Sequence, residues 1–185
     1  MTDRTTYVLV DGENIDATLG QSILGRRPQP HERPRWDRLL QFAEDHWEQP
    51  TRGLFFLAAN GELPMPFVQA LTSMGFQAVP LSGRSDEKIV DIAIQRTLEE
   101  LGRREAGVML ASNDGDFIEQ LSPLVGAGRR TALLAFREFR NSGFVPLFDR
   151  GLEFYDLEYD VRAFKDTLPR IRIVPIDEFD PRDFL

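Results

Sequence analysis

The stretch AGVMLASNDGDF, residues 106–117, joins an apolar segment to a polar turn that carries two carboxylates. Its first seven residues are apolar or small, so the pattern predicts a buried β-strand over residues 106–112. Asp114 and Asp116 follow on either side of a glycine, and a helix is expected over residues 116–125, before the glycines at 126 and 128. A buried strand that leads through a turn into a helix is the repeating unit of a parallel sheet.

Segments of these two kinds alternate on both sides of that stretch. Strands are predicted over residues 5–11, 52–60, 76–80 and 130–136, with an edge strand expected over 152–159. Helices are predicted over residues 35–47, 64–74 and 85–102, the last with Ser85 as its N-cap. The apolar strands lack a strict period of two, which is typical of strands buried on both faces. The sequence therefore predicts an α/β fold, a three-layer sandwich with a mostly parallel central sheet.

The length and composition favour one globular domain with a C-terminal appendage. The chain has 185 residues, of which 42% are hydrophobic, and its last part combines acidic and aromatic residues with prolines. We expect a domain over residues 1–160 and a tail over residues 161–185 that packs on the domain or on a partner. The polar start and the short apolar runs favour a cytoplasmic protein with no membrane segment. The absence of cysteine excludes a disulfide framework, a thiolate nucleophile and a cysteine-rich zinc site.

The net charge and its distribution bear on nucleic-acid binding. A formal charge of −8 disfavours non-specific binding to phosphates. The positive charge is nearly all arginine, whose forked side chain fits phosphate groups, and several arginines cluster in or next to residues 16–34. That segment is rich in glycine and proline and is predicted to be a functional loop, although any single arginine pair is more often a solvated surface feature. Trp36, Phe55 and Phe56 lie at core-like positions and are assigned to packing, not to base stacking.

Carboxylates recur where the predicted strands end. Asp11 ends the first strand, and Asp114 and Asp116 follow the strand over residues 106–112. Ligand sites in an open parallel sheet lie at the carboxyl ends of the strands, so these side chains are expected to converge, with Asp91 joining them from a helix. Clustered carboxylates need a cation, and oxygen ligands without histidine or cysteine fit Mg²⁺ or Mn²⁺. Such an ion would activate water for phosphodiester cleavage.

Structural explanations stay open for each motif alone. Asp11 with Gly12 fits an ordinary turn, and residues 112–117 fit a helix N-cap. Lys88 fits an ion pair with Asp91 on the same helix. A calcium loop of the EF-hand type is excluded, because its first and last ligand positions would fall on leucines. Phosphatases of the haloacid dehalogenase or Toprim type are disfavoured, because the first strand carries neither the Asp-x-Asp nor the glutamate that they need.

Three short motifs together carry a family resemblance. They are VDGENI at residues 10–15, KIVDIAI at residues 88–94 and SNDGDF at residues 112–117. With them the chain resembles the NYN domain family, the LabA-like branch of the PIN-like ribonucleases. The resemblance covers residues 5–136 and implies a PIN-like Rossmannoid sandwich that cleaves RNA with Mg²⁺ or Mn²⁺. It also implies catalytic and metal-binding roles for four aspartates and supporting roles for three further residues: Asp11, Asp91, Asp114 and Asp116, and Asn14, Ser112 and Lys88.

The chain departs from the family pattern at one helix position and in one loop. Family members often carry a further acidic residue where this chain has Thr97. The arginine-bearing loop has no family counterpart to transfer, and we expect it to contact RNA through Arg26, Arg27, Arg33 and Arg35. Two other functions stay open. One is a catalytically weak RNA-binding module, and the other is an interaction scaffold whose tail binds a second copy of the chain or another protein.

Overall fold

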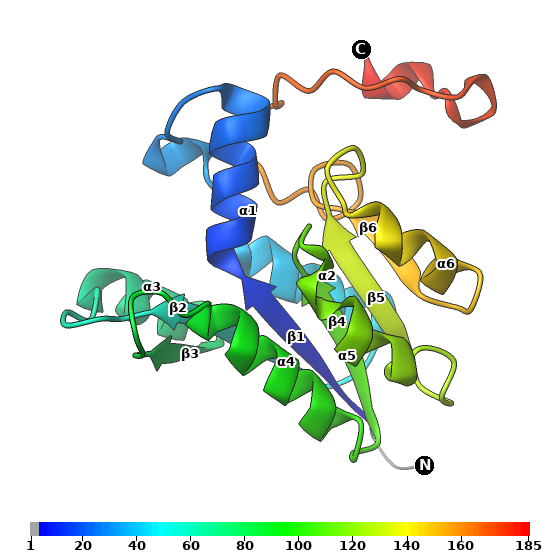
Figure 1. The fold of residues 1–185 in the computed structure, drawn as a ribbon. Helices are drawn as coiled ribbons and strands as arrows, with labels where there is room; N and C mark the ends of the chain where they lie inside the picture. Colours follow the sequence, from blue (N-terminus) through cyan, green and yellow to red (C-terminus); the bar gives the residue numbers. More distant parts are fainter. Residues whose placement is uncertain (1–3) are drawn as a thin grey trace.

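The computed structural model describes residues 4–185, which form one parallel sheet covered by helices on both faces (Figure 1). The strands are β1 (Thr5–Asp11), β2 (Thr51–Ala58), β3 (Phe76–Leu81), β4 (Ala106–Ala111), β5 (Thr131–Ala135) and β6 (Glu153–Asp156). The α-helices are α1 (Gly12–Thr18), α2 (Trp36–Trp47), α3 (Met65–Ser73), α4 (Ile89–Leu101), α5 (Ile118–Leu121) and α6 (Val145–Phe148). Every pair of neighbouring strands runs parallel, so the predicted α/β three-layer sandwich is confirmed. None of the helices within residues 4–185 combines the length and apolar character that a bilayer crossing demands.

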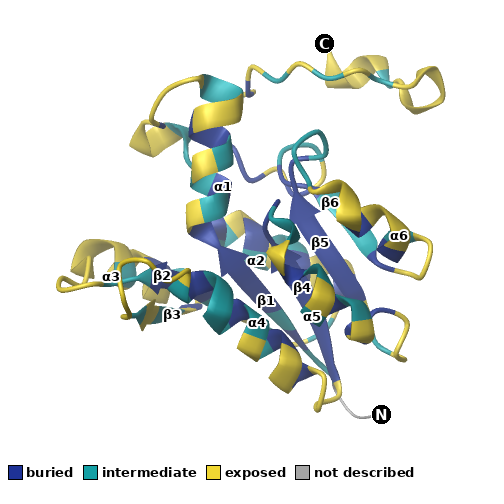
Figure 2. Ribbon diagram, in the orientation of Figure 1, coloured by how far each residue is buried: buried dark blue, intermediate teal, exposed yellow. Residues whose placement is uncertain are grey.

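Two apolar layers enclose the sheet, one on each face. Along β1 the side chains alternate, because Val8 and Val10 belong to the layer that includes α2, and Leu9 belongs to the layer that includes α4. All three are fully buried, and Figure 2 shows the central strands as the buried middle of the fold. In Figure 1, α4 and α5 lie in front of the sheet and α2 lies behind it. Burying one side chain of this size stabilises the fold by about 1.5–3 kcal/mol.

The strand order places the end of β1 where the chain reverses its course across the sheet. The order is β3-β2-β1-β4-β5-β6, so the chain winds outward from β1 to β3 and then returns to place β4 on the other side of β1. Val10 pairs with Ala111, which sets Asp11 and Ser112 side by side just beyond them. Open parallel sheets bind ligands at such a reversal, outside the carboxyl ends of the strands.

The prediction of a turn and a long loop after β1 is wrong for residues 12–24, which are helical. There α1 begins directly after β1, and a π-helical turn, Leu19–Leu24, continues it. Ile15 and Leu19 lie one helical turn apart and are fully buried against the sheet. This apolar spacing favours a helix in spite of the glycine at position 20, and Figure 1 shows the helix projecting from the end of β1.

Two other predicted helices differ in extent. The helix expected from Ser85 begins only at Ile89, because Glu87 accepts a backbone N–H of the preceding loop and holds that segment in a turn. The helix expected over residues 116–125 is divided into the short α5 and a 3-10 turn on either side of it. Pro123 has no N–H with which to continue α-helical bonding there. The edge strand is also shorter than expected, since β6 has 4 residues.

The segment after β6 packs against the domain as far as Arg170. Val161, Phe164 and Leu168 are buried in the layer that includes α2. Beyond Arg170 the chain runs clear of the sheet at the top of Figures 1 and 2, and it carries large apolar side chains in solvent. The most exposed of these are Ile171, Ile173, Ile176 and Leu185. The division of the chain at residue 160 stays a prediction.

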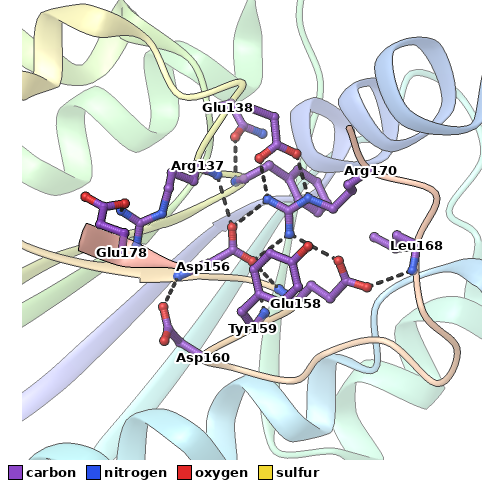
Figure 3. A network of polar contacts seen from close by, with 11 residues as sticks. Arg137, Glu138, Asp156, Glu158, Tyr159, Asp160, Leu168, Arg170 and Glu178 are labelled. Carbon is purple, nitrogen blue, oxygen red and sulfur yellow. Dashed lines mark hydrogen bonds and ion pairs between the residues drawn. The ribbon is translucent and has the colours of Figure 1, made fainter. Parts of the chain in front are cut away.

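Arg170 fastens this segment to the sheet. Its side chain is fully buried and donates to the carboxylates of Glu138, Asp156 and Glu158 at 2.5, 2.6 and 3.2 Å (Figure 3). The guanidinium carbon also lies 4.6 Å from the centre of the Tyr159 ring. Burial alone would raise the pKa of Asp156, but the hydrogen bonds and the charge of Arg170 hold that pKa below its usual range. Arg170 is therefore the cation on which the burial of these carboxylates depends.

Candidate active site

Three aspartates meet at the carboxyl edge of the sheet. Asp91 comes from the first turn of α4, and Asp114 and Asp116 come from the turn after β4. Each offers one carboxylate oxygen, and these oxygen atoms all lie within 4.8 Å of one another. Asp91 precedes Asp114 by 23 positions in the chain. The two carboxylates come close because the start of α4 lies beside the end of β4. We call these three residues the acidic cluster.

Asp11 lies beside the acidic cluster, outside the group that the 4.8 Å distance defines. It ends β1, only 2% of its surface is exposed, and it lines one cavity of about 410 Å³ together with Asp91 and Asp114. We call this space the acidic cavity. The structure therefore brings three of the four predicted aspartates together and places the fourth in the wall next to them.

Burial and the repulsion between neighbouring carboxylates raise the pKa values of two aspartates in the acidic cavity. Burial, with a smaller contribution from nearby Asp91 and Asp114, raises the pKa of Asp11 to about 7. Burial and the charge of Asp114 raise the pKa of Asp91 to about 6. Raised pKa values of this kind mark carboxylates that a bound cation would stabilise in their ionised form.

Lys88 is the positive group that contacts the acidic cluster. Its Nζ donates to Asp116 Oδ2 at 2.9 Å and lies 3.8 Å from Asp91 Oδ2. The hydrogen bond and charge of Lys88 hold the pKa of Asp116 below its usual range. The pairing expected with Asp91 is present, but the contact with Asp116 is shorter. Because 72% of the Lys88 side chain is exposed, this lysine can turn from the aspartates to an incoming anion.

Ser112 and Asn14 hold the Asp11 carboxylate by hydrogen bonds, and Ser112 also contacts the backbone of Asp114. The Ser112 hydroxyl donates to Asp11 Oδ2 at 2.9 Å, and its oxygen accepts the backbone N–H of Asp114 at 3.1 Å. The backbone N–H of Asn14 reaches Asp11 Oδ1 at 3.5 Å. Asp114 in turn accepts the backbone N–H of Asp116 at 3.0 Å, so the expected N-cap interaction and the acidic cluster coexist.

Asn113 is a site residue that the sequence reasoning missed. Its backbone N–H donates to Asn14 Oδ1 at 2.9 Å, and its side-chain oxygen accepts the backbone N–H of Phe136 at 2.9 Å. A single buried amide thus connects α1, the end of β4 and the end of β5. The available signal was its position, directly after a buried strand and between two residues already assigned to the site.

The helix positions beyond Asp91 add no acid to the cluster. Thr97 donates to the backbone oxygen of Ala93 at 2.7 Å and lines a cavity other than the acidic one. Gln95 does face the cluster, because its Nε2 donates to the backbone oxygen of Asp116 at 2.9 Å. The residue on α4 that faces the aspartates one turn further on is therefore a neutral amide.

None of the four arginines expected to contact RNA lines the acidic cavity, and three of them have carboxylate partners. Arg26 contacts Glu32 at 2.6 Å, Arg33 contacts Asp16 at 3.1 Å and Arg35 contacts Asp37 at 3.3 Å. Arg27 is exposed. A role in RNA binding stays a prediction for all four, and only Arg33 lines a cavity next to the site.

Comparisons with known proteins agree with this geometry. A model of the NYN domain matches residues 5–157, a range that contains the three motifs and all four aspartates. The chain is also similar to the crystal structure of a protein of unknown function from Vibrio parahaemolyticus, with a TM-score of 0.64 and 16% sequence identity. That similarity covers 85% of this chain and 95% of the other, and at this identity it bears on the fold alone. No curated protein sequence matches the chain significantly.

Proposed function

Because this chain belongs to the NYN domain family, a family of nuclease-type hydrolases, we propose that it is a metal-dependent ribonuclease that hydrolyses RNA phosphodiester bonds at the acidic cluster. The observation that carries the proposal is the convergence of three carboxylates from two elements within 4.8 Å, beside the buried Asp11. Repulsion between such groups costs free energy that a divalent cation offsets.

The residues of the acidic cavity fit Mg²⁺ or Mn²⁺. The donors are carboxylate oxygens, which hard cations prefer, and the chain has no cysteine that would favour zinc. Asp91, Asp114 and Asp116 would hold the ion, with Asp11 completing the negative wall. The raised pKa values of Asp11 and Asp91 support the fit, because a nearby dication would favour the ionised carboxylates that burial and the neighbouring aspartates disfavour. When bound, the ion supplies polarisation of the scissile phosphate and a more acidic water.

The other residues of the cavity would orient the substrate. Lys88 and Arg84 line the same cavity as the aspartates, and both side chains are more than two-thirds exposed at its rim. They can neutralise the phosphates on either side of the scissile bond. Because the protein has a net charge of −8, it needs such positive groups at the site itself to bind an RNA strand. Ser112 and Asn14 would keep the Asp11 carboxylate in place while the cation and the phosphate exchange.

A cleavage assay tests the proposal. Labelled RNA and DNA of the same sequence are incubated with purified protein in Mg²⁺, in Mn²⁺ and in EDTA, beside Asp114→Asn and the control Asp45→Asn, whose carboxylate lies on α2. We expect RNA cleavage with either metal, none in EDTA and none by Asp114→Asn, with the control equal to the unchanged protein. Absence of cleavage under every metal condition, or equal cleavage by Asp114→Asn, would reject it.

An RNA-binding module without catalysis is the second candidate. The neutral Gln95 facing the cluster and the position of Thr97 outside it favour this candidate, since neither position adds an acid that could help to hold a metal. RNA binding in EDTA without cleavage in Mg²⁺ would identify it. The apolar side chains exposed beyond residue 170 support a further proposal, that the tail binds a second copy of the chain or another protein.

A further inference from the structure

A second cavity, of about 220 Å³, adjoins the acidic cavity, and Glu13 lines both. Four aromatic residues line it, together with the segment before α2, and we call it the aromatic cavity. Its charged and aromatic lining includes Glu13, Asp16, Arg33, Trp36, Phe55 and Phe67. None of the three motifs that point to RNA cleavage includes its aromatic residues.

The aromatic walls are built from interlocking rings. The Trp36 and Phe55 ring centres lie 5.1 Å apart at an interplanar angle of 78°, and the Phe55 and Phe67 ring centres lie 5.4 Å apart at 83°. Trp36 and Phe55 are buried, whereas Phe67 is 38% exposed at the rim. Gly12 is required here, because a side chain at its position would collide with the Phe55 ring. The assignment of Trp36 and Phe55 to packing is therefore incomplete, since both also line this space.

A charged pair lies at the polar rim of the aromatic cavity. Arg33 Nε is 3.1 Å from Asp16 Oδ1, so the two side chains form an ion pair, and 39% of the Arg33 side chain is exposed. The exposed part of the Arg33 guanidinium can donate hydrogen bonds to a ligand in the cavity. Asp16 and Glu13 provide acceptors on the same rim.

Contacts on both sides of Arg33 hold the wall that contains it in place. Arg35 donates its backbone N–H to the carbonyl oxygen of Ala163 at 2.6 Å, and Pro34 is buried. On the other side, Glu32 accepts both the Arg26 guanidinium and the backbone N–H of residue 29. The cavity is thus formed before any ligand arrives, as specific binding sites usually are.

We propose that the aromatic cavity takes one unstacked base of the RNA strand that passes the acidic cluster. The proposal rests on the proposed function, because it needs a strand at the adjoining site. The partly exposed Phe67 ring offers stacking, and the rim of Arg33, Asp16 and Glu13 offers both donors and acceptors to a base edge. A base must leave its helix to enter, so the substrate class is single-stranded or looped RNA and not continuous duplex.

Fluorescence of 2-aminopurine tests this inference in EDTA, where binding is measured without cleavage. The fluorophore is placed at each position of a short single-stranded RNA in turn, and affinity and intensity are recorded for the unchanged protein, Phe67→Ala and Arg33→Gln. Phe179→Ala is the control, because it removes another exposed phenylalanine, from the tail. Circular dichroism and the melting temperature verify that each variant is folded.

We expect one RNA position to change its fluorescence on binding, and Phe67→Ala to abolish that change and weaken affinity roughly 5- to 100-fold. Arg33→Gln should also weaken binding, the control should not, and duplex RNA should bind less tightly. The inference is overturned if no position responds, if both variants bind like the unchanged protein, or if RNA does not bind. Cleavage that is insensitive to Phe67→Ala would reject the base site alone, and a Phe67-dependent signal without cleavage in Mg²⁺ would reject the ribonuclease alone.

Discussion

The Ser112 hydroxyl donates a hydrogen bond of 2.9 Å to Asp11 Oδ2, across 101 positions of the chain. This bond joins the ends of β1 and β4 at the reversal of the sheet, where the acidic cavity opens. It is also the strongest influence that lowers the pKa of Asp11 against the effect of burial. Ser112 therefore links the stability of the fold to the charge of the site.

Ser112→Ala should lower the free energy of unfolding by about 1–3 kcal/mol at pH 8, because the buried Asp11 carboxylate loses its side-chain donor. Urea unfolding measures the change, and Ser22→Ala, at an exposed position, is the matched control. Equal stability of the two variants would show that the hydrogen bond contributes nothing.

Asp91→Asn should raise the melting temperature in EDTA, because it removes one of three crowded negative charges. The same variant should lose the stabilisation by Mg²⁺, which for an intact site amounts to roughly 5–10 °C at a hundred times the dissociation constant. Differential scanning calorimetry with and without metal measures both effects. A variant that is still stabilised by Mg²⁺ as strongly as the unchanged protein would place the metal elsewhere.

Arg170→Met should lower the free energy of unfolding by about 3–5 kcal/mol, because the buried Asp156 and the partly buried Glu138 and Glu158 lose their shared cation. Arg182→Met is the control, since the Arg182 side chain is 87% exposed and its ion pair with Asp180 should contribute little to stability. Chemical denaturation of both variants at pH 7 gives the comparison. If the two variants lose the same free energy of unfolding, the ion pairs of Arg170 contribute no more to stability than an exposed ion pair.

The cost of Arg170→Met should shrink as the pH falls from 7 to 3. In the unchanged protein the pKa of Asp156 is depressed, so its contribution to stability is present above its unfolded pKa of about 3.9 and is lost as the pH falls toward the folded value. In the variant the three carboxylates lack their cation, and their protonation at low pH removes the unfavourable negative charge, so the variant is less destabilised there. Burial raises the pKa of Glu158, which limits the slope in the unchanged protein. Unfolding free energies at pH 7, 5 and 3 measure the trend, and a constant difference would contradict it.

Two truncations should separate the anchored part of the tail from the exposed part. Removing residues 171–185 should change the free energy of unfolding by less than about 1 kcal/mol, because the apolar side chains removed are mostly in solvent. Removing residue 170 as well should cost as much as Arg170→Met. Denaturation tests this pair, and light scattering shows whether the shorter truncation changes the oligomeric state, as a tail that joins two copies would require.

The sequence predicted the sheet and the site motifs because both depend on local patterns. The apolar stretches that form β1, β2, β4 and β5 are contiguous, and the aspartates stand directly after strands or on the first turn of a helix. Their convergence follows from the strand order, which the alternation of strands and helices restricts. Whether these aspartates catalyse the reaction stays a prediction.

Features that depend on contacts far apart in the chain were not predictable in the same way. The helical course of residues 12–24 depends on the burial of Ile15 and Leu19 against the sheet, which overrides the loop-like composition. The role of Arg170 depends on carboxylates that lie 12 to 32 positions earlier in the chain. The aromatic cavity likewise arises only when α1, α3 and the segment before α2 come together.

The Arg35 hydrogen bond to Ala163 has a consequence for how this domain can diversify. The aspartates lie inside the range that the NYN model matches, whereas Ala163 lies past its end at residue 157. A chain truncated at residue 157 would keep all four aspartates and lose a support of the wall of the aromatic cavity. The residues that line both cavities lie inside the matched range, but one support of the aromatic cavity comes from beyond it. Changes after residue 157 can therefore act on the aromatic cavity while the four aspartates stay unchanged.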